Sequence, residues 1–349
     1  MNTFKKFGYE NEEINSRLEN IWFEIFEGPN KFYFENGDFA YIVDTGNDDV
    51  RTEGMSYGML MAVLYDRQDV FDKLWNWTMK YMYMDYGIHE HYFAWSVDPS
   101  GKKNAEGPAP DGEEFFAVAL LMASNRWGDK EGIYNYSYRA RELLKYCLHK
   151  GTKYPGHSMW NLENKYIKFV PEVEFTDPSY HTPHFYEIFS LYSYEEDRKF
   201  WKEAATESRL FLEKALHPET GLSAEYSDYD GNPMLDTEHP HFYSDSYRTV
   251  LNVTIDTLWN GGNEELLKRL ERHQNFFMNN DIDAIYAIDG EFISKPTLHP
   301  VGLVATIAST AAAIPEYKHS KYWIDRFWNT PLREDDRRYY DNFLYAFSF

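Results

Sequence analysis

The stretch that decides the fold is residues 52–83, "TEGMSYGMLMAVLYDRQDVFDKLWNWTMKYMY", which contains two different helical patterns in succession. The first pattern, over residues 52–66, has almost no charge beyond its opening turn, as expected of a helix that is buried on all sides. The second, over residues 68–83, has charged residues on one face and apolar residues at helical spacing, as expected of a surface helix. A single residue separates them. The stretch therefore predicts a hairpin of one inner and one outer helix.

The same alternation continues along the chain and gives about twelve candidate helices. Inner helices of the uncharged kind are predicted at 52–66, 111–127, 245–260 and 299–314, and outer helices with one charged face at 68–83, 134–150, 195–216 and 262–280. The remaining helices are predicted at 11–27, 184–194, 319–330 and 339–349. Strand signals are confined to short pieces at 31–34 and 283–293.

The lengths of the connections alternate as well. Each inner helix passes to its outer partner through roughly one to seven residues, whereas each outer helix returns to the next inner helix through about 20 to 33. The sequence therefore predicts an all-α fold, an (α/α)6 barrel of six helical hairpins, formed as a single domain by residues 1–349. We expect the long loops and the starts of the inner helices to gather at one end, which is a natural place for a site.

Composition excludes several classes of partner. The chain has 57 acidic against 35 basic residues and a formal net charge of -22, so nucleic acid and anionic membranes would be repelled. The single cysteine, Cys147, is expected to be a buried structural thiol. The first residues lack an apolar segment of signal length, and nowhere do about 18 apolar residues run together. We expect a monomeric cytoplasmic protein.

Polar residues open most of the predicted inner helices. An acidic residue in the first turn of a helix often only caps it. Several such residues at one end of a barrel, beside loops rich in tryptophan and tyrosine at 89–99, 156–166 and 224–231, instead favour binding and cleavage of a sugar chain. These helix-opening residues are Glu53, Asp111, Tyr180, His181, Asp245 and His299.

Hydrolysis of a glycosidic bond requires one carboxylic acid to protonate the leaving oxygen and a second carboxylate that acts as a base or nucleophile. Glu53 and Asp245 are the candidate pair. Arg248 lies one turn after Asp245 and is close enough to orient that carboxylate. Small residues follow Glu53 and are predicted to leave room for a substrate: Gly54, Ser56 and Gly58.

The protonation of Glu53 is an open question at this level. A general acid must hold its proton, but a helix start and the neighbouring Arg51 both favour the ionised form. Burial among aromatic groups and a second carboxylate such as Asp111 would favour the protonated form.

The chain resembles family 8 glycoside hydrolases in "DVRTEGMSYGM" (49–59), "WNWT" (75–78), "FAWS" (93–96), "PAPDGEE" (108–114), "DPSYHTPHFYE" (177–187) and "SDSYR" (244–248). It is most similar to those members that release xylose from the reducing end of xylo-oligosaccharides, through "DTGNDDVRTEGMSYGM" (44–59), "EVEFTDPSYH" (172–181), "TLHPVGL" (297–303) and "FWNTP" (327–331). The motifs occur in order from about Phe4 to the C-terminus. The resemblance also predicts a longer last inner helix than "YYDNFLYAFSF" provides.

The resemblance implies an (α/α)6 barrel that hydrolyses short β-1,4-xylo-oligosaccharides with inversion. Glu53 is then the general acid, and Asp245 is the general base that activates water. A water between the two carboxyl groups implies a separation of roughly 6.5 to 9.5 Å.

The resemblance also implies roles in substrate binding. Asp111 holds the sugar in the cleavage subsite, Tyr180 positions the attacking water, and Trp95 and Trp160 line the sugar subsites. His299, in the Leu-His-Pro loop, closes the cleft beyond one sugar unit on the reducing side, so single xylose units are released. The alternative for His299 is that it only caps the helix opened by the following proline.

Other functions remain possible on the same fold. These are an endo-acting family 8 xylanase or β-glucanase, a sugar epimerase, and a sugar-binding protein without catalysis. A metal site at His181, His184, His239 and His241 is disfavoured, because a proline interrupts the first pair and the second gives no regular face. We therefore expect no metal and no cofactor.

Overall fold

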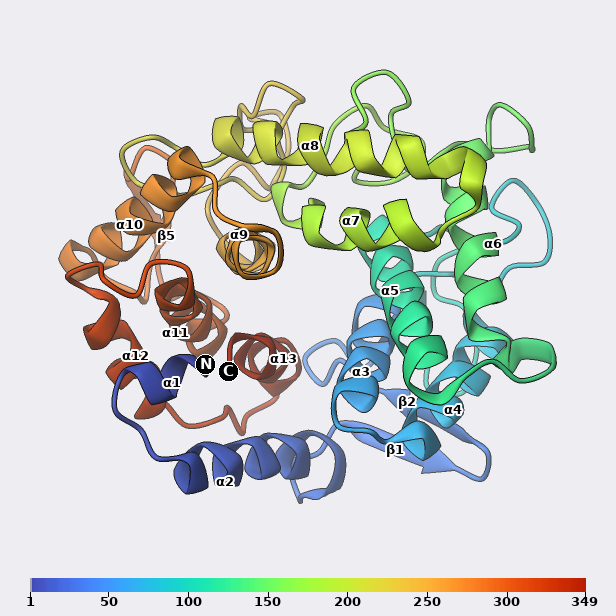
Figure 1. Cartoon of the computed structure of the whole chain (residues 1–349), viewed down its shortest axis with the longest axis horizontal. Coiled ribbons are helices and arrows are strands. Elements are labelled where there is room, and N and C mark those ends of the chain that lie inside the picture. Colours follow the sequence, from blue (N-terminus) through green and yellow to red (C-terminus); the bar gives the residue numbers. More distant parts are fainter. Residues whose placement is uncertain (1) are drawn as a thin grey trace. The chain divides into compact units, whose positions relative to one another are not determined.

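The computed structural model describes residues 2–349 and is mostly helical (Figure 1). Its contacts divide the chain into two compact units. Unit 1 comprises Met1–Lys31, Phe175–His184 and Thr206–Phe349, and unit 2 comprises Phe32–Glu174 and Phe185–Ala205. No helix among residues 2–349 is long and apolar enough to cross a membrane.

Unit 2 contains β1 (Tyr33–Asn36), β2 (Phe39–Ile42), β3 (Val50–Arg51), α3 (Thr52–Leu64), α4 (Gln68–Trp77), η2 (Thr78–Met82), β4 (Ser96–Val97), α5 (Pro110–Trp127), η3 (Gly132–Tyr134), α6 (Tyr136–His149) and η5 (Glu195–Asp197). Helices α7 (Pro183–Tyr192) and α8 (Arg198–Ala215) belong partly to each unit.

Unit 1 contains α1 (Thr3–Lys6), α2 (Asn11–Trp22), η1 (Phe23–Glu27), η4 (Pro178–Tyr180), η6 (Ser244–Ser246), α9 (Tyr247–Asn260), α10 (Glu264–Asn279), β5 (Ile285–Tyr286), β6 (Phe292–Ser294), α11 (Pro300–Ser309), η7 (Thr310–Ala312), α12 (Ser320–Trp328) and α13 (Arg338–Ser348). Every helical range predicted from the sequence therefore contains a helix.

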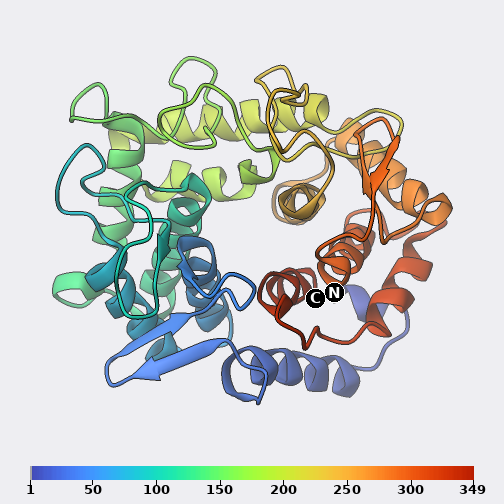
Figure 2. The same cartoon turned by 180° about the vertical axis from the view of Figure 1, so that it is seen from behind.

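In unit 2, α3 packs against both α4 and α5, and α5 also packs against α6. Nearly all of α3 is buried, which explains why its sequence carries no charge after the first turn. Helix α4 buries one face, including Phe71 and Trp75, and exposes Asp69 on another. The antiparallel hairpin of β1 and β2 lies against α4 through β2 (Figure 2).

In unit 1, α11 packs against α9, α12 and α13 (Figure 1). Helix α11 is apolar and buried from Gly302 to Ser309, as predicted for an inner helix. Helix α10 is amphipathic and contributes one face to a hydrophobic core that consists of Leu212, Leu216, Val250, Val253, Leu266, Leu270 and Ile314. The first and last helices of the chain are also neighbours in unit 1. The ring of Phe4 in α1 stacks on that of Phe349, which follows α13, with centroids 4.3 Å apart.

The predicted rule for loop length has one exception. Long connections at residues 83–109, 150–182, 216–243 and 280–299 precede α5, α7, η6 and α11. The connection from α12 to α13 spans only residues 329–337, so the last hairpin does not follow the rule. A second difference is the β3–β4 pair, which no periodicity in the sequence indicates because each strand has two residues.

Candidate active site

The candidate acid, Glu53, lies in the first turn of α3, directly after β3. Strand β3 pairs with β4, and the N–H of Thr52 donates to the carbonyl of Trp95 at 3.0 Å. This pairing brings the Arg51 guanidinium over the Trp95 ring, 5.4 Å from its centroid. Trp95 is 36% exposed, so part of its ring is accessible beside the start of α3.

Arg51 is paired with two carboxylates. Its Nε lies 2.9 Å from Oδ1 of Asp49 and 3.2 Å from Oδ2 of Asp44. Oδ2 of Asp49 accepts a further hydrogen bond from the Ser96 hydroxyl at 2.6 Å. These two carboxylates compensate the positive charge of Arg51. Arg51 therefore stabilises an ionised Glu53 less than an arginine without such partners would.

The starts of α5 and α3 lie in close contact. A Cβ added to Gly112 would be 2.5 Å from both Cβ and Oγ1 of Thr52, so only glycine allows this approach. Glu53 follows Thr52, and Asp111 precedes Gly112. The two carboxylates therefore belong to neighbouring helix starts, and Asp111 is 7% exposed.

Glu113 is a buried carboxyl group that the sequence analysis did not single out. Its Oε1 accepts the N–H of Phe93 at 3.0 Å, whereas Oε2 is buried without a hydrogen-bond partner. Burial raises the pKa of Glu113 well above its usual range, and the charge of Asp111 adds to this effect. The sequence signal was present, because Glu113 lies within "PAPDGEE".

Two of the small residues after Glu53, Ser56 and Gly58, do not leave room for a substrate as predicted. A Cβ at Gly58 would meet Cγ1 of Ile42 at 3.1 Å and Cδ1 of Leu74 at 3.2 Å, so Gly58 permits packing of β2 and α4 on α3. Ser56 is fully buried, and its hydroxyl donates to the carbonyl of Glu53 at 2.9 Å. These two residues are part of the core.

Trp160 also differs from its prediction. Its side chain is fully buried in unit 2, where it packs edge-on against Trp201 at 4.9 Å and against Tyr186 at 5.8 Å between centroids. No face of this ring is accessible to a sugar, so Trp160 contributes to the core.

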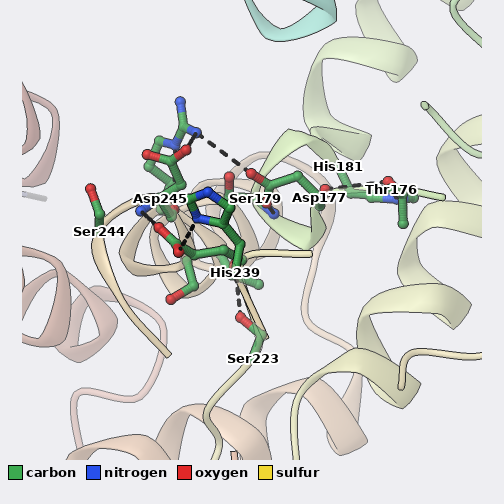
Figure 3. Close-up of polar contacts among 12 residues, drawn as sticks. Thr176, Asp177, Ser179, His181, Ser223, His239, Ser244 and Asp245 are labelled. Atoms are coloured by element: carbon green, nitrogen blue, oxygen red, sulfur yellow. Dashed lines mark hydrogen bonds and ion pairs between the residues drawn. The ribbon is translucent and has the colours of Figure 1, made fainter. Parts of the chain in front are cut away.

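The candidate base, Asp245, lies in unit 1 within η6, the 3-10 turn that leads into α9 (Figure 3). The turn is closed by Ser246, whose hydroxyl accepts the N–H of Tyr243 at 3.0 Å. Nη2 of Arg248 lies 3.7 Å from Oδ2 of Asp245. The Asp245 side chain is 37% exposed, which leaves its carboxylate accessible to water.

Arg248 also lies near Asp177 and Tyr180. Its Nη2 is 3.9 Å from Oδ2 of Asp177, which is fully buried, and its guanidinium lies 5.5 Å from the centre of the Tyr180 ring. Burial raises the pKa of Asp177 well above its usual range, although Arg248 opposes this. Asn252 donates to the carbonyl of Ser179 at 2.8 Å and fixes η4, which holds Tyr180, against α9.

Two residues near Asp245 were not predicted. Oε1 of Glu225 accepts the backbone N–H of Asp245 at 3.3 Å, and Oε2 pairs with Nδ1 of His239 at 2.9 Å (Figure 3). Glu225 lies in the aromatic loop at 224–231, but nothing in that loop's spacing indicates contact with Asp245.

His299 is held by a buried carboxylate. Its Nδ1 lies 3.0 Å from Oδ2 of Asp341 in α13, and the same oxygen accepts from Nη1 of Arg333 at 2.6 Å. Oδ1 of Asp341 accepts the N–H of Gly302 at 2.6 Å. The His299 side chain makes no capping hydrogen bond to α11, so the simple capping alternative is not what the structure shows.

The histidines that the sequence analysis considered as metal ligands have other contacts. His181 lies between the hydroxyls of Thr176 and Ser208, at 3.1 and 2.9 Å, and burial lowers its pKa to about 3. Among residues 2–349, no group of three or more His, Cys, Asp or Glu side chains could hold a metal ion.

A family model described as "Glycosyl hydrolases family 8" matches residues 17–347. The chain belongs to glycosyl hydrolase family 8. It is 55% identical to the reducing end xylose-releasing exo-oligoxylanase of Bifidobacterium adolescentis, over 99% of this chain and 93% of that one. It is also 55% identical to the enzyme of that name from Halalkalibacterium halodurans, over 99% of this chain and 91% of the relative.

Solved structures show the same fold. A reducing-end-xylose releasing exo-oligoxylanase complexed with xylose has a TM-score of 0.98 and 55% identity, and the match covers 100% of this chain and 94% of that one. This agreement confirms the predicted fold class, the all-α (α/α)6 barrel of family 8. That residues 1–349 act as one domain stays a prediction.

Proposed function

We propose that this family 8 enzyme is a monomeric cytoplasmic exo-oligoxylanase that removes xylose from the reducing end of short β-1,4-xylo-oligosaccharides with inversion. Glu53 is the general acid and Asp245 is the general base. The identity of 55% to two relatives that carry this name supports the substrate and the direction of attack.

The observation that carries the assignment of residues is a match in spacing. Solved variants of a relative have one aspartate replaced, one tyrosine replaced by phenylalanine, and one glutamate replaced by alanine in a complex with xylobiose. That tyrosine and aspartate are separated by the same number of residues as Tyr180 and Asp245. The glutamate precedes the tyrosine by one residue more than Glu53 precedes Tyr180.

In the proposed reaction, Glu53 protonates the glycosidic oxygen as the bond to the anomeric carbon breaks. Asp245 accepts a proton from a water that attacks the opposite face of that carbon, so configuration inverts. Arg248 lies beside the Asp245 carboxylate and orients it. Tyr180, beside Arg248, positions the water.

The groups around Glu53 and at the start of α11 determine which substrate binds. Asp111 binds hydroxyls of the sugar that is cleaved, and the accessible ring of Trp95 stacks on a sugar. His299 limits the reducing side to one unit. Its contact with buried Asp341 fixes the imidazole, which a steric limit requires.

An endo-acting enzyme is the second candidate, because the chain is also 29% identical to endoglucanase 2 of Ruminiclostridium josui over 76% of its length. Digestion of xylotriose labelled at its reducing end distinguishes the candidates. Exo-action from that end releases all label as xylose. Inversion makes the α anomer of the unlabelled xylobiose, which carries the attacked anomeric carbon, appear first by NMR.

Other outcomes contradict specific parts of the proposal. Labelled xylobiose would mean attack from the other end, and a mixture of labelled products from xylohexaose would mean endo-action. A β anomer appearing first would mean retention. An intact but epimerised sugar would exclude hydrolysis.

A further inference from the structure

The contact between Glu225 and the turn of Asp245 takes no direct part in the proposed proton transfers. Glu225 offers one carboxylate oxygen to the backbone N–H of Asp245, at 3.3 Å, and the other to Nδ1 of His239, at 2.9 Å (Figure 3). The Glu225 side chain is 5% exposed and that of His239 is 43% exposed. Glu225 therefore connects a solvent-accessible histidine to the backbone of the proposed base.

We infer that Glu225 is a positioning residue for Asp245, and that His239 keeps Glu225 in the ionised form that positioning requires. This inference rests on the proposed role of Asp245 as the general base.

Positioning through the backbone matters because the Asp245 side chain is weakly held. Its charged partner, Arg248, lies 3.7 Å away, and the side chain is partly exposed. The turn η6 has only three residues, so the backbone of Asp245 largely decides where its carboxylate begins. Misplacing a reacting group by about 1 Å can cost about a hundredfold in rate.

Ionisation of Glu225 matters because its Oε1 accepts the N–H of Asp245 and, when Glu225 is ionised, its Oε2 accepts from Nδ1 of His239. Protonation would turn one acceptor into a donor, and the arrangement with Asp245 and His239 would be lost. Burial raises the pKa of Glu225 and the charge of Asp245 raises it further, while the hydrogen bond to His239 lowers it. In return, the hydrogen bond to Glu225 raises the pKa of His239.

The acidic neighbours of the pair, Asp245 and Glu238, favour its protonation. Two arginines lie nearby: Arg248 beside Asp245, and Arg337, whose charge acts on Tyr243. The other titratable groups facing the pair are tyrosines whose pKa values are raised, so they stay neutral: Tyr226, Tyr243 and Tyr247. The hydrogen bond to His239 has the largest effect that lowers the pKa of Glu225, so His239 keeps Glu225 ionised as pH falls.

The first experiment measures kcat and KM for xylotriose in Glu225→Ala and Glu225→Gln. Alanine removes the anchor, so kcat falls by about tenfold to a hundredfold while KM changes by less than about threefold. Glutamine has one acceptor and one donor, like protonated Glu225, so it also loses the arrangement and lowers kcat, at every pH. An alanine or glutamine variant with the kcat of the parent would overturn the positioning role.

The second experiment measures the pH profile of kcat for His239→Ala. Without its hydrogen bond, Glu225 takes up a proton at higher pH, so the acid limb moves upward by about half a pH unit or more. His239→Ala in the Glu225→Gln background leaves the acid limb where it is, because glutamine does not titrate. An equal movement in both backgrounds would show that His239 acts by another route.

The matched control is Asp197→Asn, which breaks the contact between Asp197 and Nε2 of His149 in unit 2, at 2.7 Å with a similarly buried carboxylate. It should leave kcat and its pH profile unchanged. If Glu225→Ala fails to fold, the Glu225→Gln and His239→Ala variants decide the test. A parent protein that does not cleave xylotriose would refute the proposed function. An active parent whose variants keep the parental kcat and pH profile would refute only this inference.

Discussion

Asp245 and Glu53 differ in how the fold holds their carboxyl groups. Asp245 is partly exposed and has Arg248 beside it, so water can reach the proposed general base while Arg248 orients it. Glu53 follows Arg51, whose charge is compensated by Asp44 and Asp49. The charge of Arg51, which the sequence places beside the proposed acid, is thus paired with two neighbouring carboxylates.

Replacing either group tests its role at the level of the single residue. We expect Glu53→Gln and Asp245→Asn each to lower kcat on xylotriose by at least about a hundredfold, since each removes a proton transfer without changing shape. Melting temperatures should stay close to that of the parent. An Asp245→Asn variant with parental kcat would mean that another group activates the water.

Glu113 gives a prediction about pH and stability. In the unfolded chain its pKa is about 4.3, and in the folded chain it is raised. The folded state therefore binds more protons above about pH 4, and the parent's unfolding free energy falls as pH rises through that window. Glu113→Gln removes this loss, so the unfolding free energy of the variant increases relative to that of the parent as pH rises above about 4.

Urea unfolding at several pH values measures this difference. The control is Glu264→Gln, which changes an exposed side chain at the start of α10 and should show no comparable gain. A difference between Glu113→Gln and the parent that is constant with pH would contradict the prediction.

At the scale of elements, the inner helices were predictable and their contacts were not. Helices α3 and α11 are buried on all sides, so their sequences lack charge after the first turn, and this lack of charge predicts them as inner helices. The β3–β4 pair has no periodicity to detect, yet it brings Trp95 to Arg51. Trp160 is a related case, because whether a loop tryptophan is accessible depends on packing partners far away in the chain.

The contact between α3 and α5 gives a prediction at this scale. Gly112→Ala would place a Cβ 2.5 Å from Thr52, so the helix starts must separate. We expect a loss of about 1 to 3 kcal/mol in unfolding free energy and a raised KM, because Asp111 moves. Gly58→Ala is the matched comparison, since its nearest contacts, Cγ1 of Ile42 at 3.1 Å and Cδ1 of Leu74 at 3.2 Å, are much longer than the 2.5 Å at Gly112.

Both substitutions gain about 1 kcal/mol in helix propensity, so only the contact differs. Gly58→Ala should therefore be nearly neutral in urea unfolding and in KM. Equal effects of the two substitutions would show that the approach of α5 to α3 does not require Gly112.

At the scale of the whole molecule, the net charge of -22 is spread along the chain and opposes the compact state through self-repulsion. We expect the melting temperature at pH 7 to rise by a few degrees between about 0.02 and 0.5 M NaCl, because salt screens this repulsion. KCl at equal ionic strength should act equally. A melting temperature that falls with salt would mean that attractive ion pairs dominate.

The order of segments in the two units has a consequence for synthesis on the ribosome. Unit 2 ends at Ala205, whereas unit 1 takes its first helices from Met1–Lys31 and its last from the C-terminus. Residues 2–31 are thus synthesised before unit 2, although unit 1 is completed after it, and Phe4 can contact Phe349 only when α13 has been made. Arg17 in α2 likewise contacts Trp328 and Tyr345, so α2 stays without these partners until late in translation, which makes it the segment that we expect a nascent-chain chaperone to protect.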